Sequence, residues 1–207
     1  MSRMECSADA QPGEQVLAIL GFHNIGGPPA GDWDTWFYVS EATFGGLLGR
    51  IQENAWRVID LPTFLVGLAA PASLPERSVL LTFDDGYQSM RRVALPWLLR
   101  FGYPGVLFVP TDYIGMRNEF DAGIEPPEAI CDWDDLRELE RQGVSVQSRR
   151  SKATLEAGLG KPVEVIAYPL GDGGANQQGV ERALERTGYR ARHQPSSDAR
   201  ADENVRT

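Results

Sequence analysis

The sequence predicts an α/β fold with parallel strands, and three observations point to it. Short apolar runs of strand length alternate with longer segments of helical spacing between residues 16 and 193. The run Ser78–Phe83 is almost continuously apolar, as expected of a strand buried on both faces. Polar residues follow several of these runs directly, which is typical of strand ends that carry the loops of a parallel sheet.

The first half of the chain begins with a strand at Val16–His23, whose apolar run is too short to span a membrane. Apolar residues recur on one face of 43–55 and predict a helix there. Trp56–Leu61 has strand composition, and a short helix is expected over 62–68. The buried strand at Ser78–Phe83 comes next.

The second half of the chain shows the same alternation of predicted strands and helices. Helical spacing extends over Ser89–Phe101, with Gly102 as the C-cap, and the next strand is Gly105–Val109. Asp132 is expected to N-cap a helix that ends at Gly143. The later elements follow from the same criteria: strand Val144–Val146, helix Ser151–Leu159, strand Val163–Tyr168, helix Val180–Thr187 and strand Tyr189–His193.

Length and composition predict one globular domain. The chain has 207 residues, 42% of them hydrophobic, which is enough for a substantial core. The domain is expected over 15–193, between a flexible N-terminus at 1–14 and a disordered tail at 194–207, because both ends are polar and lack apolar periodicity. One long loop, Asn118–Ile130, is a candidate lining for a cleft.

Charge and cysteine content exclude several classes of partner. A net charge of −9 opposes binding to phosphate backbones, so no nucleic-acid partner is expected. Cys6 and Cys131 have no metal-binding or redox spacing and are expected to be free thiols. There is neither a membrane span nor a basic region followed by an apolar leader, so the predicted location is the cytoplasm.

Three groups of polar residues are expected to meet at one rim of the sheet. His23 lies at the end of the first strand, Asp84 and Asp85 follow Ser78–Phe83, and a turn at 168–172 begins where the strand before it ends. Two adjacent carboxylates can divide the work of hydrolysis, one as a metal ligand and one as a proton acceptor. The alternative is that Asp-Asp-Gly only makes a turn.

Several motifs resemble landmarks of the polysaccharide deacetylase family, whose domain is a distorted (β/α) barrel. The most specific is the TFDDG signature, matched by Thr82–Tyr87. The resemblance extends over about 16–192, and its further matches, in the family's order, are Gly21–Ile25, Phe37–Ser40, Phe108–Pro110, Trp133–Leu136 and Ala167–Asp172.

The resemblance implies roles for individual residues. Asp84 would be the general base, Asp85 a ligand of a divalent metal, expected to be zinc, and the backbone N–H near Leu170 a donor to the oxyanion. The expected substrate is a carbohydrate, and its implied contacts are His23, Tyr87, Tyr168, Pro169 and Gly171. Direct metal ligation by His23 is the alternative for that residue.

The chain departs from the family after Val144–Ser148, where members continue with the two-histidine motif H-[ST]-x-x-H. Here Arg149-Arg150-Ser151 follows, which suggests an internal deletion near 148–151. A catalytic zinc usually has three protein ligands, but the chain has only two histidines. Two arginines at the rim would also repel a metal ion, unless they are only the solvated start of the next helix.

The family's C-terminal strand and its late histidine motif have no match in 195–207. The barrel would then be incomplete. Unpaired strand edges and exposed apolar surface are expected in that case, and with them a tendency to self-associate.

These observations support one main hypothesis and two alternatives. The first is a deacetylase that removes acetyl groups from N-acetylated or O-acetylated sugars by a metal-activated water. The second is an inactive, truncated member that binds glycans through exposed aromatic residues, the candidates being Trp33, Trp36, Tyr87 and Trp133. Phosphoryl transfer is disfavoured, because the chain lacks Asp-x-Asp spacing and a glycine-rich phosphate loop at the acidic strand end.

Overall fold

The structure is a computed structural model that describes residues 15–31, 33, 35, 37–149, 151–167 and 191–193. At 166, 167 and 191–193 the backbone alone is described. The predicted flexible N-terminus, the helix at 180–187, the turn at 168–172 and the disordered tail lie outside these residues.

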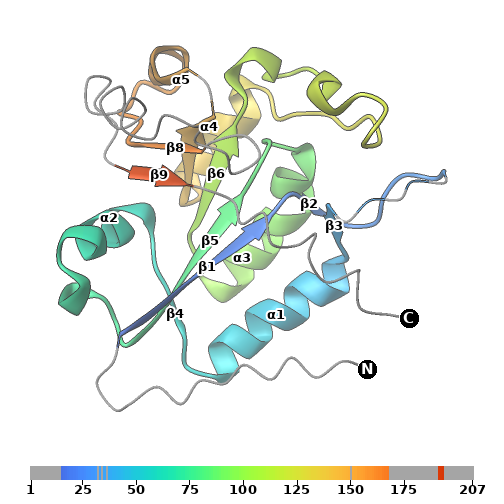
Figure 1. Ribbon diagram of the computed structural model, residues 1–207. Helices are drawn as coiled ribbons and strands as arrows, with labels where there is room; N and C mark the ends of the chain where they lie inside the picture. The colour runs from blue at the N-terminus through green and yellow to red at the C-terminus, as the bar shows by residue number, and fades with distance from the viewer. Residues whose placement is uncertain are drawn as a thin grey trace, which may run out of the picture.

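The described strands form one parallel sheet of seven strands (Figure 1). Its order is β1-β5-β6-β7-β8-β9, and β4 pairs with the first half of β5. The strands are β1 (Val16–Phe22), β4 (Arg57–Val58), β5 (Arg77–Phe83), β6 (Gly105–Val109), β7 (Val144–Ser148), β8 (Val165–Ala167) and β9 (Ala191–His193). A separate two-residue pair joins β2 (Asn24–Ile25) to β3 (Tyr38–Val39). The predicted parallel α/β architecture is confirmed.

The helices begin where the sequence offers a capping side chain. Ser40, Asp60, Asp132 and Ser151 each accept a hydrogen bond from a backbone amide of the first turn of a helix. Gly102 ends one helix in the left-handed conformation, with φ of 67°. The α-helices are α1 (Glu41–Glu53), α2 (Leu61–Ala69), α3 (Leu95–Phe101), α4 (Trp133–Arg141) and α5 (Lys152–Leu159).

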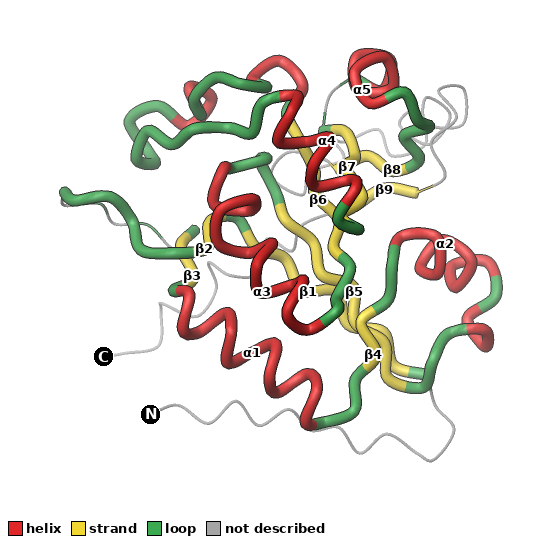
Figure 2. Tube along the Cα trace, turned by 180° about the vertical axis from the view of Figure 1, so that it is seen from behind, coloured by secondary structure: helices red, strands yellow, loops and turns green. Residues whose placement is uncertain are grey.

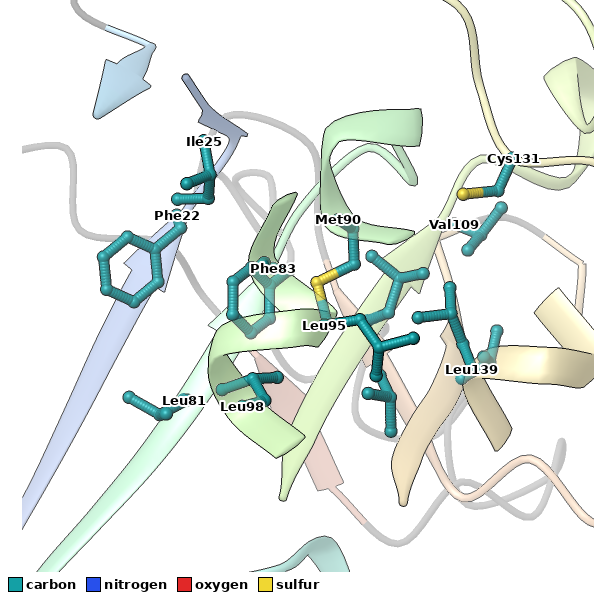
Figure 3. Close-up of a cluster of buried hydrophobic side chains, with 14 of the residues drawn as sticks. Phe22, Ile25, Leu81, Phe83, Met90, Leu95, Leu98, Val109, Cys131 and Leu139 are labelled. Carbon is teal, nitrogen blue, oxygen red and sulfur yellow. The ribbon is translucent and has the colours of Figure 1, made fainter. Parts of the chain in front are cut away.

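Alternate residues of the central strands pack into two apolar clusters on opposite faces of the sheet. Leu81, Phe83 and Val109 belong to the larger cluster (Figure 3). This cluster includes buried residues of α1, α3, α4 and α5. Leu80 and Phe108, which alternate with them along the strands, pack in a smaller cluster with residues of α2. Figure 2 shows α1, α3 and α4 on one side of the strands and α2 apart from them. Burial of both faces explains why β5 and β6 are apolar without alternation.

Two predicted elements differ from the structure for local reasons. The predicted strand 56–61 shortens to β4, because Asp60 caps α2 and Leu61 already belongs to that helix. The predicted helix 89–101 divides into a π-helical turn, Met90–Ala94, and α3. Pro96 has no N–H to continue the regular ladder, and the Leu95 amide donates to the Met90 carbonyl five residues earlier.

The sheet is open in the described part of the chain, where β1 and β9 lie at its two ends. This agrees with a (β/α) barrel that is distorted and not closed. None of the described helices has both the length and the apolar character needed to cross a membrane.

Candidate active site

The carboxyl ends of three strands bring together the polar residues of the site. Asp84 and Asp85 follow β5, His23 follows β1, and Arg149 follows β7. The Asp84 amide donates to the Phe22 carbonyl over 2.8 Å, which extends the pairing of β1 with β5. The Arg149 amide donates to the carbonyl of Val109, the last residue of β6, over 3.0 Å. The backbone of the site is therefore held by the sheet.

Asp-Asp-Gly makes a tight turn that also buries both acids. Asp85 and Gly86 have φ of 66° and 67°, a left-handed conformation that Asp tolerates and glycine adopts freely. A Cβ at Gly86 would lie 3.2 Å from the Val109 side chain, so there is little room for another residue. Asp84 is 2% exposed and Asp85 3%. The predicted turn and the predicted acid pair are thus one feature.

Asp84 has the properties of a proton acceptor. Burial raises the pKa of its carboxyl from 3.8 to about 6, while the nearby Arg149 cation acts to lower it. Oδ1 of Asp84 is buried and accepts no hydrogen bond within the described structure. A buried carboxylate with a pKa near neutrality and an unused oxygen can take a proton from a water or a substrate.

Asp85 lies between two nitrogen-bearing side chains. Its Oδ1 is in an ion pair with Nη1 of Arg149, and its Oδ2 lies 3.7 Å from Nε2 of His23. The exposed fractions of the three side chains are 4% for Asp85, 13% for Arg149 and 18% for His23. Arg149 is therefore not the solvated start of the following helix, which was the alternative at the sequence level. Arg150 lies outside the described residues.

His23 is positioned by an aromatic neighbour. Its ring stacks on Phe37 with 4.4 Å between the centroids and 8° between the planes. The next residue, Asn24, is buried and accepts a hydrogen bond from Ser89 at 2.9 Å. The imidazole is thus held at the rim beside Asp85, where it can donate to a carboxylate or contact a substrate.

The described side chains at this rim do not fit the divalent metal that the resemblance implies. Asp84, Asp85 and His23 are the described side chains of metal-ligand type here, but they do not form a group that could hold one ion, whereas a catalytic zinc usually takes three protein ligands. No group of three or more His, Cys, Asp or Glu side chains suited to a metal is found within the described ranges. Their neighbour Arg149 carries no lone pair for a metal and remains protonated.

The structure corrects the expected role of Tyr87. The residue is 1% exposed, and its hydroxyl accepts a hydrogen bond from Asn118 at 3.4 Å. Tyr87 also forms an isolated β-bridge with Ile130. The ring therefore holds the loop 118–130 and presents no surface to a sugar. The other implied contacts, Tyr168, Pro169 and Gly171, and the oxyanion donor near Leu170 lie outside the described residues.

Two features of the site were missed at the sequence level. The first is Phe37, which supports His23. Phe37 belongs to one of the motifs that resemble the family, but ring stacking has no sequence period. The second is the segment after the acids, where Arg91 pairs with Asp135 at 2.9 Å and Gln88 donates to the same carboxylate at 3.4 Å. The helix α4 therefore holds the residues that follow Asp85. Cys131, beside this segment, is a buried free thiol, as expected.

Comparison with known sequences identifies the relatives of the chain. The profile of the polysaccharide deacetylase family matches residues 72–191. One relative is the Bacillus subtilis (strain 168) protein YxkH, which is named as a candidate polysaccharide deacetylase. It is 24% identical over 182 residues, which cover 84% of this chain and 62% of the length of YxkH. The poly-β-1,6-N-acetyl-D-glucosamine N-deacetylase of Escherichia coli (strain K12) is 27% identical over 95 residues, 44% of this chain. The chain covers only 14% of the length of that relative. It therefore spans less than two thirds of the length of each of these two proteins, 62% of YxkH and 14% of the Escherichia coli protein.

Comparison with solved structures shows a shared fold. IcaB from Ammonifex degensii matches with a TM-score of 0.71 at 22% identity, over 88% of each chain. The Streptococcus pyogenes deacetylase PplD, solved in complex with acetate, matches with a TM-score of 0.67 at 19% identity, over 84% of this chain and 81% of its own.

Proposed function

Because the chain belongs to the polysaccharide deacetylase family, we propose that it hydrolyses acetyl groups from N-acetylated sugars, with O-acetylated sugars as the alternative substrates. The family match covers more than half of the chain. The Escherichia coli relative is by name an N-deacetylase of a β-1,6-linked N-acetylglucosamine polymer. An amide-linked acetyl group on a sugar amine is accordingly the expected scissile group.

The placement of Asp84 carries this proposal. A general base works best when its pKa lies near the working pH, and burial raises the pKa of Asp84 to about 6. Its buried Oδ1 is not engaged by any described donor, and its neighbours at the rim are a carboxylate and a cation. Carboxyl groups whose pKa is shifted by burial and a specific charged neighbour are concentrated at functional sites, which supports the proposal.

The proposed reaction needs one proton acceptor and one incoming water. Asp84 takes a proton from the water, whose oxygen forms a bond to the acetyl carbon. The tetrahedral intermediate then collapses, the carbon–nitrogen bond breaks, and the proton passes from Asp84 to the leaving amine, so that a free amine and acetic acid result, and the acid ionises to acetate in water. The turn 168–171, with the N–H near Leu170, is proposed to bind the oxyanion.

Members of the family are generally metal-dependent. A metal would supply a more acidic water and polarise the acetyl carbonyl. No step above depends on one, because the side chains beside Asp85 do not fit that role.

Acetate release from defined oligosaccharides tests the proposal. The substrates are N-acetylated chito-oligosaccharides and β-1,6-linked N-acetylglucosamine oligomers, with acetate and free amine measured together, with and without added zinc. Asp84→Asn should lower the rate by about 10²- to 10⁴-fold. Asp134→Asn is the matched control, because its side chain is 95% exposed. The rate should also fall as the pH drops through about 6, since Asp84 is then protonated.

A second candidate function is glycan binding without turnover. The observation that favours it is the ion pair of Asp85 with Arg149, which occupies the carboxylate implied as a metal ligand. Binding of the same oligosaccharides, measured by calorimetry, with no acetate released at any metal concentration would support this candidate. If the chain neither binds these oligosaccharides nor releases acetate from them, both functions are contradicted.

A further inference from the structure

Asp85 has its charge balanced by the protein itself. Oδ1 contacts the guanidinium of Arg149, and Oδ2 faces the imidazole of His23 at 3.7 Å. The Asp85 side chain is 4% exposed, so water does little to solvate its charge. A buried carboxylate is stable in the ionised form only when such a partner is close.

Arg149 is brought to this position by the sheet. It directly follows β7, and its amide donates to the carbonyl of Val109 at the end of β6. Its side chain is 13% exposed, compared with 70% for Arg141, which also pairs with a carboxylate. The guanidinium is therefore part of the packed rim.

An arginine side chain and a metal ion compete for the same carboxylate oxygen. The guanidinium has five N–H donors and no lone pair, so it satisfies Asp85 but cannot join a metal's ligands. Its positive charge also repels a dication at contact distance. Arginine keeps its charge throughout the range of pH in which proteins are stable.

We infer that Arg149 is the resident cation of Asp85, so that its guanidinium takes the place of a divalent metal and the chain binds no such metal through this carboxylate. The inference concerns the same rim as the proposed function, but it does not depend on turnover. It also implies that a chelator removes no metal ion from Asp85.

The experiment has two arms, both on the full chain. The first is calorimetric titration of chelator-stripped protein with zinc and with cobalt, beside Asp85→Ala. The second is thermal unfolding of Arg149→Met, Asp85→Asn and the double variant, in the presence and absence of a chelator. Arg141→Met is the matched control, because it removes an exposed arginine from an ion pair with Glu138.

The inference predicts no micromolar metal binding that depends on Asp85. Arg149→Met should lower the melting temperature by on the order of 10 °C, because it leaves a buried charge without its partner. The double variant should regain most of this loss, and Arg141→Met should change little. Micromolar zinc or cobalt binding that Asp85→Ala abolishes would overturn the inference, and so would additive effects in the double variant. If Arg149→Met does not fold, the titration of the unmodified chain decides alone.

Discussion

The burial that suits Asp84 to its proposed catalytic role also destabilises the folded protein when this carboxyl is ionised. The folded state raises the pKa of its carboxyl from 3.8 to about 6, so the folded chain binds this proton more tightly than the unfolded chain. The stability that the protonated form has below pH 4 is therefore lost as the pH rises through 6. Charge buried at this position is the physical cause.

Asp84→Asn is accordingly expected to stabilise the protein at high pH while it removes activity. The gain in the free energy of unfolding should be on the order of 3 kcal/mol at pH 8 and small at pH 4, because a shift of one pKa unit corresponds to about 1.4 kcal/mol. Urea unfolding of the variant and of the unmodified chain at both pH values measures this. The same gain at pH 4 and pH 8 would show that ionisation of Asp84 is not the cause, and Asp134→Asn should show no gain at either.

A single contact, the ion pair with Arg149, changes the role assigned to Asp85. By resemblance this residue is a metal ligand, whereas the structure pairs it with Arg149. The sequence shows an arginine after β7, and electrostatics alone predicts repulsion of a metal. That the guanidinium reaches Asp85 depends on the course of its side chain, which has no sequence signature.

At the scale of elements, the first turn of α4 supports the segment that follows the acids. Asp132 accepts hydrogen bonds from the amides of Asp134 and Asp135 at 2.9 Å and 2.8 Å. The Asp135 carboxylate in turn bonds the Asp132 amide, Arg91 and Gln88. This capping box was predicted in part, since Asp132 was expected as the N-cap.

Loss of this cap should be measurable as a loss of stability. Asp132→Ala leaves two amides of the first turn of α4 without their acceptor, and should lower the free energy of unfolding by about 1 kcal/mol. Asp134→Ala, in the same turn but 95% exposed, is the control and should have a smaller effect. Urea unfolding of the two variants compares them directly. Equal losses would mean that acidic charge near the helix terminus, and not the cap, provides the stabilisation.

The π-helical turn Met90–Ala94 shows where periodicity is insufficient. Apolar spacing predicts one helix from 89 to 101, and the apolar residues do lie in helical segments. The position of Pro96 could have indicated an irregularity, because proline removes a backbone donor. Whether the ladder breaks, bends or widens into a π-turn depends on packing against neighbouring elements.

For the whole molecule, the open sheet leads to a prediction about association. In the described structure β1 is an edge strand, and Ile19 on it is 43% exposed. An apolar edge with unpaired backbone groups is a template for pairing with another chain. We expect the apparent mass to rise with protein concentration in light scattering. Ile19→Lys should reduce this rise, because a charge at an edge opposes strand pairing; a constant monomer mass for the unmodified chain would contradict the expectation.

Local patterns were sufficient for much of the architecture. Continuous apolar runs predicted β5 and β6 as buried strands. Asp132, as the expected N-cap, placed the beginning of α4, and the predicted helix Ser151–Leu159 begins within a residue of α5. The same patterns placed Asp84 and Asp85 at the carboxyl end of a strand, since a turn after a strand is a local event. The family resemblance depends on such short motifs and is confirmed by the family match over 72–191.

The partners of the site residues could not be predicted in this way. Arg149, Asp85 and His23 come from three strands that are far apart in the sequence, and they meet because β1, β5, β6 and β7 lie in parallel order. The burial of Tyr87 likewise depends on the return of the loop 118–130 across it. Strand order and side-chain rotamers are properties of the packed chain. Residue types and their spacing therefore determine the fold class and the position of the acids, while packing alone determines which cation faces them.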